Sequence, residues 1–383
     1  MELYVHIPFC KQKCRYCSFT SHTATEAEYE EYADLLLREA ENRKKEISDP
    51  VSTVYIGGGT PSLLSPALFY RLVSGLRRIF DFERVTEFTT EANPGTVTGE
   101  WLDSAVSCGV NRLSLGMQAA QDHLLSQLGR IHCFEDVRHS VSLARAAGIN
   151  NLSLDLIFGI PNQRIQDWTD TLESALSLHP EHISAYGLIP EEGTPLYKDL
   201  EKGTLTLPDP DDERMMYDDA LKRLSMNGFY QYEISNFARK GYECRHNIGY
   251  WTQIPYIGIG VSAASMTDIT ADGNGMSYIR RTNPDSLDAY REMVINHVLS
   301  ASVESIDPAE SRFETMMLGL RMNSGVSESD FLQKHAVTAE SVFGSRLRML
   351  EKKGLMTHEH GCWNLTRRGF DIQNSILVEL MDD

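Results

Sequence analysis

The chain lacks several features that define other classes of protein. None of its apolar runs approaches the ~20 residues that a membrane-spanning helix requires. No signal peptide precedes the first predicted strand, which begins at Leu3, directly after Met1 and Glu2. We therefore expect a cytoplasmic protein that reaches a membrane only at its periphery, through its partners.

Positive charge is also scarce, with 36 Lys and Arg against 54 Asp and Glu and a formal net charge of −18. Nucleic-acid binding depends on cations that neutralise phosphates, so this composition argues against nucleic acid as a partner. The 7 cysteines are an odd number in a long chain, whereas a secreted disulfide scaffold has an even number in a much shorter one. The cysteines instead indicate metal or redox chemistry in a reducing compartment.

Short β-branched runs alternate with helical patterns over the first two hundred residues. Strands are predicted at 3–7, 53–56, 87–91, 112–115, 152–157 and 182–188. Helices are predicted at 26–47, 65–80, 99–108, 133–147 and 165–178. This alternation predicts an α/β fold with a parallel sheet and right-handed crossovers, closed into a partial (β/α)6 barrel. An open, doubly wound sheet is the alternative.

The unusual residues gather at the carboxyl ends of these predicted strands. They are the cysteines of 10–17, the glycines of 57–61, Glu91, the segment 116–118 and Asp155. Active sites of parallel barrels are built at that rim. The sequence therefore predicts one site there.

Beyond Pro208 the alternation stops. A helix is predicted at 211–228, and the last unit has the helix–helix–hairpin order of a winged helix. We expect three units: a barrel at 1–207, a connecting region at 208–306 that covers its mouth, and a winged-helix-like domain at 307–383. Because winged helices often bind DNA and this one carries local positive charge, a nucleic-acid module stays open as an alternative.

Cys10, Cys14 and Cys17 have the spacing C-x3-C-x2-C in a loop after the first predicted strand. Thiolates suit an iron–sulfur cluster or zinc, and zinc would take His6 or His22 as its fourth ligand. The basic residues between the cysteines are expected to lower the thiol pKa. In a [4Fe–4S] cluster, three cysteines leave one iron without a protein ligand, and that iron is open to a small chelating molecule.

The segment Tyr4-Val-His-Ile-Pro-Phe-Cys10, followed by this spacing, resembles the radical S-adenosylmethionine (SAM) superfamily. Over nearly its whole length the chain resembles the branch that contains oxygen-independent coproporphyrinogen III dehydrogenase and the haem chaperone HemW. The resemblance implies a [4Fe–4S] cluster on the three cysteines, with SAM bound at the vacant iron. It also implies reductive cleavage of SAM to a 5′-deoxyadenosyl radical, fed by an electron donor such as flavodoxin or ferredoxin.

The same resemblance assigns further residues to the cofactors. Contacts with SAM or the cluster are implied for Tyr4, Tyr16, Gly58, Gly59, Thr60, Glu91, Gln118, Arg130 and Asp155. Taken singly, each has an ordinary structural explanation, such as a glycine turn, a capping carboxylate or a surface charge. Asp155 differs, because a carboxylate in an apolar strand demands a partner.

A second motif, His246-Asn-Ile-Gly-Tyr250-Trp251, matches the H-N-x-x-Y-W pattern associated with haem binding in HemW proteins. Imidazole is a common axial ligand of haem iron, and the two aromatic rings offer flat apolar surface to a porphyrin. Cys244 and His6 are alternative ligands. Phe19 departs from the coproporphyrinogen dehydrogenases, which carry a further cysteine at that place, and this puts dehydrogenase activity in doubt.

The function that this resemblance implies is that of a haem chaperone. It would bind the cluster, SAM and haem, and deliver haem to apo-haemoproteins such as respiratory enzymes. The cluster and SAM would support transfer or the formation of a homodimer. One alternative is a radical SAM enzyme, dehydrogenase-like or a methyltransferase, acting on a tetrapyrrole or another aromatic substrate. The other is a non-catalytic zinc or nucleic-acid module.

Overall fold

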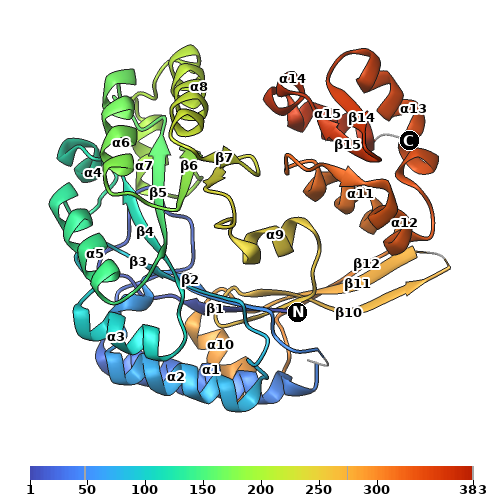
Figure 1. Ribbon diagram of the computed structural model, residues 1–383. Coiled ribbons are helices and arrows are strands. Elements are labelled where there is room, and N and C mark those ends of the chain that lie inside the picture. The colour runs from blue at the N-terminus through green and yellow to red at the C-terminus, as the bar shows by residue number, and fades with distance from the viewer. Residues whose placement is uncertain (47–48, 274, 382–383) are drawn as a thin grey trace.

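The computed structural model describes residues 1–46, 49–273 and 275–381, and its frame is a curved parallel sheet (Figure 1). The six central strands are β1 (Glu2–Ile7), β2 (Thr53–Gly58), β3 (Glu87–Ala92), β4 (Arg112–Gln118), β5 (Asn151–Phe158) and β6 (His182–Gly187). They pair in parallel and in sequence order. The predicted partial barrel is thereby confirmed, and each predicted strand lies within three residues of its observed bounds.

The connecting helices cover the outer side of this sheet (Figure 1). They are α1 (Glu26–Arg43), α2 (Pro66–Ile79), α3 (Gly99–Ser107), α4 (Asp122–Gln127), α5 (Phe134–Ala146) and α6 (Ile165–Ser177). Local sequence explains their starts: at α2, the Ser65 hydroxyl accepts a hydrogen bond from the backbone N–H of Leu68, and Pro66 occupies the first turn. The side chains of Leu72 and Leu76, one turn apart, are then buried in the core.

The first helix is shorter than the predicted 26–47. It ends at Arg43, followed by a 3-10 turn over Lys44–Glu46, and Ile47 lies outside the described residues. The Arg43 side chain is buried and donates hydrogen bonds to the Gly258 carbonyl (2.8 Å) and the Ser265 hydroxyl (3.0 Å). The end of this helix is therefore tied to a part of the chain more than two hundred residues away.

The sheet extends well beyond the six strands that the sequence predicts. The added strands are β7 (Tyr230–Gln231), β8 (Asn236–Ala238), β9 (Tyr256–Ile259), β10 (Ala264–Asp272), β11 (Gly275–Thr282) and β12 (Ser302–Ile306). Strand β9 pairs in parallel with β1, and the whole sheet has the order β12-β11-β10-β9-β1-β2-β3-β4-β5-β6-β8-β7. The predicted connecting region thus contributes strands to both ends of the barrel sheet.

Four further helices lie in the stretch from β6 to β12. They are α7 (Pro195–Glu201), α8 (Pro210–Met226), α9 (Arg245–Trp251) and α10 (Leu287–Ile295). The sequence predicts only α8, at 211–228. Helix α9 carries the H-N-x-x-Y-W motif and contacts β2. It lies on the side of the sheet opposite α1 and α2 (Figure 1).

The C-terminal part has its own core, which includes Phe331, Leu347 and Trp363. Its elements are α11 (Pro308–Gly319), β13 (Val326–Ser327), α12 (Glu328–His335), α13 (Ala339–Lys352), β14 (Met356–Glu359), β15 (Cys362–Leu365), α14 (Arg367–Asp371) and α15 (Gln373–Met381). Helices followed by a hairpin agree with the winged-helix-like prediction, although the sequence analysis does not predict α12, α14 and α15. An ion pair between Arg367 and Asp218 of α8 (2.9 Å) joins this part to the connecting region.

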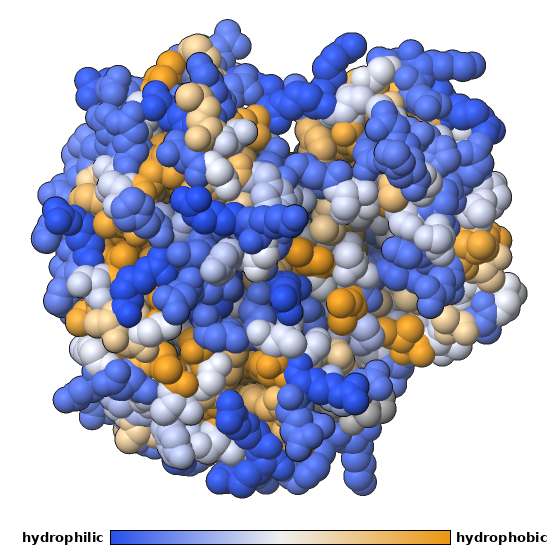
Figure 2. Space-filling view, in the orientation of Figure 1, coloured by the Kyte–Doolittle hydropathy of each residue, from blue (hydrophilic) through white to orange (hydrophobic). Residues whose placement is uncertain are grey.

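The surface shown in Figure 2 is mostly hydrophilic, with hydrophobic groups scattered over it. Exposed apolar side chains such as Val303 and Met226 lie far apart in the chain. In the described part of the chain, each helix is too short or too polar to span a lipid bilayer.

A buried carboxyl lies beneath the barrel at the start of β1. The Glu2 side chain is 1% exposed, and its Oε2 has no hydrogen-bond partner among the described residues. Burial raises the pKa of Glu2 from 4.5 to about 8, and the nearby Glu87 carboxylate adds to the shift. Between pH 4.5 and about pH 8, the folded protein therefore keeps a proton on Glu2 that the unfolded chain loses.

Because the folded state binds one more proton than the unfolded state, the free energy of unfolding falls as the pH rises from about 4.5 to about 8. We expect Glu2→Gln to raise the free energy of unfolding at alkaline pH by about 1–3 kcal/mol, since one pKa unit corresponds to about 1.4 kcal/mol. Near pH 4.5 the variant should match the wild type. Urea unfolding at both pH values measures this, and parallel pH profiles for the two proteins would contradict it.

Candidate functional site

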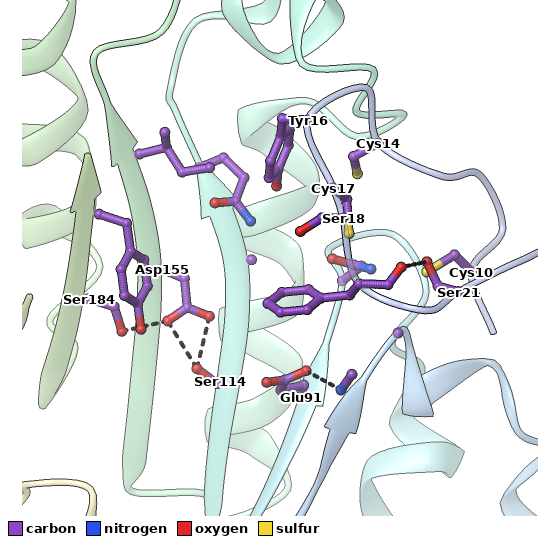
Figure 3. Close-up of a pocket in the computed structure, with 18 of the residues that line it drawn as sticks. Cys10, Cys14, Tyr16, Cys17, Ser18, Ser21, Glu91, Ser114, Asp155 and Ser184 are labelled. Atoms are coloured by element: carbon purple, nitrogen blue, oxygen red, sulfur yellow. Dashed lines mark hydrogen bonds between the residues drawn. The ribbon is translucent and has the colours of Figure 1, made fainter. Parts of the chain in front are cut away.

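A cavity of about 400 Å³ lies at the carboxyl ends of β1–β6. In Figure 3 the three cysteines stand on one side of it, while Asp155, Ser114 and Ser184 stand on the other. Every central strand except β1 contributes a lining residue directly, and the loop after β1 contributes the cysteines. The three cysteines, Glu91 and Asp155, which the sequence places at this rim, thus line one cavity.

Backbone hydrogen bonds at both ends and in the middle fix the cysteine loop. The Cys10 N–H donates to the His22 carbonyl (2.9 Å) and the His22 N–H donates to the Pro8 carbonyl (2.8 Å), so the loop is closed at its neck. In its middle, the Arg15 N–H donates to the Leu128 carbonyl, at the end of α4. These backbone hydrogen bonds hold the loop on the barrel rim.

The glycines at the end of β2 allow a close approach to this loop. The Gly59 N–H donates to the Ile7 carbonyl (2.8 Å), and the Thr60 N–H donates to the Phe9 carbonyl (2.7 Å). A Cβ on Gly59 would lie 2.6 Å from the Ile7 oxygen, and one on Gly58, where φ is +101°, would lie 2.3 Å from the His6 ring. These glycines therefore have a packing role, in addition to the SAM contact that the family resemblance implies for them.

The arrangement of the cysteines does not favour a zinc ion. Among residues 1–46, 49–273 and 275–381, no group of three or more His, Cys, Asp or Glu is placed to hold one metal ion. His6, the proposed fourth ligand, has Nδ1 2.9 Å from the Tyr4 hydroxyl and Nε2 2.9 Å from the Thr20 carbonyl. A cubane cluster takes each thiolate on a different iron, so its ligands need not converge on one point.

Two of the thiols accept hydrogen bonds from side chains. The Arg130 Nη1 donates to Cys14 Sγ (3.3 Å), and the Thr60 hydroxyl donates to Cys10 Sγ (3.6 Å). Asn93 connects the two donors, because its Nδ2 donates to Thr60 Oγ1 (2.7 Å) and its Oδ1 accepts from Arg130. These donors suit sulfur that carries negative charge, as in a cluster-bound thiolate.

Cys17 corrects the expectation that basic neighbours lower the thiol pKa. Its pKa is raised, chiefly because burial disfavours the thiolate, and the other cysteines add to the shift. The neighbouring Lys13 is only a minor opposing influence, because its ammonium group is exposed and donates to the Phe19 carbonyl.

The two predicted carboxylates are held by neighbouring strands. Glu91 accepts hydrogen bonds from the Tyr55 hydroxyl (2.7 Å) and the Gly58 N–H (2.9 Å), and burial raises its pKa. Asp155 accepts from Ser114 (3.0 Å) and Ser184 (2.7 Å), and burial raises its pKa as well. The partner that Asp155 required is therefore a set of hydroxyls on the adjacent strands.

The other predicted SAM residues divide between different places. Tyr16, Gly58, Gly59, Gln118 and Arg130 line the cavity together with the two carboxylates. Thr60 instead lies beside Cys10, to which its hydroxyl donates. Tyr4 lines a second cavity, whose wall also contains Tyr250 and Trp251.

Sequence reasoning missed Tyr55, Asn93, Ser114 and Ser184. Only Asn93 could have been predicted from the sequence, because it belongs to the Glu91-Ala-Asn-Pro-Gly95 motif. The serines and Tyr55 are ordinary strand residues, and only the sheet register shows that they lie beside the carboxylates.

His246 is buried apart from both cavities. It is 1% exposed, with Nδ1 2.8 Å from the Thr53 hydroxyl and Nε2 2.9 Å from the Tyr250 hydroxyl. Its ring stacks on Tyr55 at 5.2 Å, and burial lowers its pKa to about 3. Both nitrogens are thus engaged within the protein, whereas Tyr250 and Trp251 line the second cavity.

Of the two alternative ligands, His6 lines the second cavity and Cys244 is fully buried. Its Sγ lies 3.5 Å from Glu87 Oε1, and burial raises its pKa to about 12. A thiolate is therefore strongly disfavoured there.

Comparison with known proteins places this fold and site in a family. The Radical SAM superfamily model matches residues 4–175, and the HemN C-terminal domain model matches residues 306–372. The structure is similar to coproporphyrinogen III oxidase (HemN) from Escherichia coli, with a TM-score of 0.85, covering 99% of this chain and 89% of that chain. At 23% identity this likeness shows the fold alone. The chain is a member of the radical SAM superfamily.

Its nearer relatives are more specific. The chain is 35% identical to the heme chaperone HemW of Bacillus subtilis, over 97% of both chains. It is 32% identical to HemW of Escherichia coli, over 98% of this chain and 97% of that protein. Within the superfamily, the chain belongs to the family of the HemW haem chaperones. Membership confirms the predicted [4Fe–4S] cluster and SAM as cofactors.

The hydrogen bond from Thr60 to Cys10 leads to a test. A donor to a cluster sulfur favours the reduced, more negative state, so we expect Thr60→Val to shift the midpoint potential of the reconstituted cluster to lower values. Ser62→Ala is the matched control, because the Ser62 hydroxyl is buried nearby but pairs with Thr96 at 2.6 Å. Redox titration followed by electron paramagnetic resonance measures both, and equal potentials in all three proteins would refute the role.

His246 should contribute to stability before any ligand binds. We expect His246→Ala to lower the free energy of unfolding by about 2–3 kcal/mol, because a buried ring is lost and two hydroxyls lose their partner. Denaturant unfolding of the ligand-free protein measures this, with exposed His139→Ala as the control. Wild-type stability in His246→Ala would show that the imidazole has no structural role.

Proposed function

We propose that this protein is a haem chaperone, which binds a [4Fe–4S] cluster, SAM and haem and delivers haem to apo-haemoproteins such as respiratory enzymes. The observation that carries the proposal is the near full-length relationship to proteins named heme chaperones. Two separate cavities support it, one lined by the cysteines and the other by Tyr250 and Trp251.

We assign the cluster to Cys10, Cys14 and Cys17, and SAM to the adjacent cavity. When bound, the cluster and SAM supply one-electron chemistry. The protein contributes position and charge: Arg130 and Thr60 donate to two of the thiolates, and the carboxyls of Glu91 and Asp155 face the cavity. The proposed SAM contacts are Tyr4, Tyr16, Gly58, Gly59, Thr60, Glu91, Gln118, Arg130 and Asp155. Tyr4 and Thr60 would act on SAM through other residues, because Tyr4 contacts His6 and Thr60 contacts Cys10.

The remaining features of the chaperone are also proposals. We divide the chain into units 1–207, 208–306 and 307–383, and expect a flavodoxin or ferredoxin as electron donor and a homodimer in solution. The net charge of −18 supports docking to partners with basic surfaces. We place the protein in the cytoplasm, where it meets membrane-bound haemoproteins at the membrane surface.

Haem titration under anaerobic conditions tests this function. After cluster reconstitution, we expect stoichiometric haem binding by absorbance and transfer of that haem to an apo-haemoprotein. We expect no turnover of coproporphyrinogen III, because Phe19 occupies the place of the further cysteine. Free haem at equal concentration is the control for transfer.

The contrary outcome would define an enzyme. No haem binding, together with 5′-deoxyadenosine formation that depends on an added tetrapyrrole, would replace the chaperone by a radical SAM enzyme. Both measurements use the same reconstituted samples, so one preparation decides between the two functions.

A further inference from the structure

A second cavity, of about 610 Å³, lies between the extended end of the sheet and helix α11. Its volume is within the range of about 300–1,000 Å³ that is usual for small-molecule sites. Aromatic and thioether side chains dominate its wall, among them Tyr250, Trp251, Tyr256, Met266 and Met317. These groups come from α9, β9, β10 and α11, so the cavity exists only because the sheet continues beyond β1.

Two buried donors on residues of this wall have no hydrogen-bond partner among the described residues. The Trp251 Nε1 and the Gln253 Nε2 make no hydrogen bond to any residue in the described part of the chain. Gln253 is 5% exposed, and its other amide atom, Oε1, already accepts a hydrogen bond from the Thr315 hydroxyl (2.5 Å). Buried donors are normally satisfied, so two unpaired ones in a single cavity indicate a ligand that brings acceptors.

The same cavity wall contains a cationic side chain, that of Arg280. Arg280 pairs with Glu314 (2.6 Å) and with Glu304 (2.8 Å), and the Glu304 side chain is 60% exposed. An anionic ligand can therefore replace the solvent-exposed Glu304 at this guanidinium without leaving a buried charge unpaired.

The combination defines the chemistry of the ligand. Flat rings and thioethers favour a planar apolar body, while the donors of Trp251 and Gln253, with Arg280, favour carboxylates at its edge. We infer that this cavity is the haem site, and that Trp251 Nε1 and Gln253 Nε2 bind the haem carboxylates. The inference rests on the proposed function, and it sets His246 outside the ligand site, since its nitrogens are engaged by Thr53 and Tyr250.

Esterified haem separates the roles of the carboxylates and the ring. We expect the wild type to bind haem at least tenfold more tightly than haem dimethyl ester, because the ester loses charge-assisted hydrogen bonds. Trp251→Phe and Gln253→Leu should each weaken haem binding about tenfold and change ester binding little. Anaerobic absorbance titration of the reconstituted full chain provides all the affinities.

Trp101→Phe is the matched control, because Trp101 on α3 also has a buried Nε1 without a partner among the described residues, but packs against Phe69 on α2. Thermal unfolding confirms that each variant is folded. Equal affinity for haem and its ester, or unchanged affinity in both cavity variants, would overturn the inference while the chaperone function stands. A wild type that binds neither compound would overturn the proposed function itself.

Discussion

The contact between the cysteine loop and the end of β2 is the constraint on which the site depends. Two backbone hydrogen bonds, from Gly59 and Thr60, hold the chain of Ile7–Phe9 so closely that a Cβ on Gly59 would collide with it. The same contact brings the Thr60 hydroxyl to Cys10 and, through Asn93, connects it with Arg130. The position of the thiols is thus set by main chain, and side chains then adjust their electrostatics.

Around this contact the barrel interior keeps polar groups that a purely structural core would exclude. Burial raises the pKa of Glu91 and Asp155, and hydrogen bonds from Tyr55, Gly58 and serine hydroxyls offset part of that cost. Such buried titratable groups are typical of functional sites. Their arrangement at one rim, beside the cysteines, fits a cavity built for a charged and polar cofactor.

Much of the barrel can be predicted from the sequence, because its strands and helices alternate locally and carry their own caps and core residues. The six central strands, the family and the haem-chaperone function at family level are confirmed. Strands β7 and β8 were missed because they are two and three residues long, and β9 because it gains its pairing from β1. Strands β10 and β11 form a local hairpin, but polar residues such as Asp268 and Arg281 interrupt their apolar pattern. The roles of individual site residues remain predictions.

In the site, too, contacts between residues far apart in the sequence could not be predicted. The cysteine spacing and the family resemblance predicted roles for the cysteines, Glu91 and Asp155. Neither could predict that Ser114 and Ser184 surround Asp155 from neighbouring strands. It also treated the H-N-x-x-Y-W motif as one unit. The fold divides that motif, with His246 buried between α9 and β2, and Tyr250 and Trp251 at a cavity wall.

The residues that follow Cys17 belong to two cavities at once. Ser18 and Phe19 line both the cysteine cavity and the aromatic one, and Phe19 is 67% exposed between them. A ligand that shifts this segment in one cavity alters binding in the other, and thermodynamic reciprocity makes the factor equal in both directions. Ser18 and Phe19 are therefore the residues through which binding in one cavity would be coupled to binding in the other.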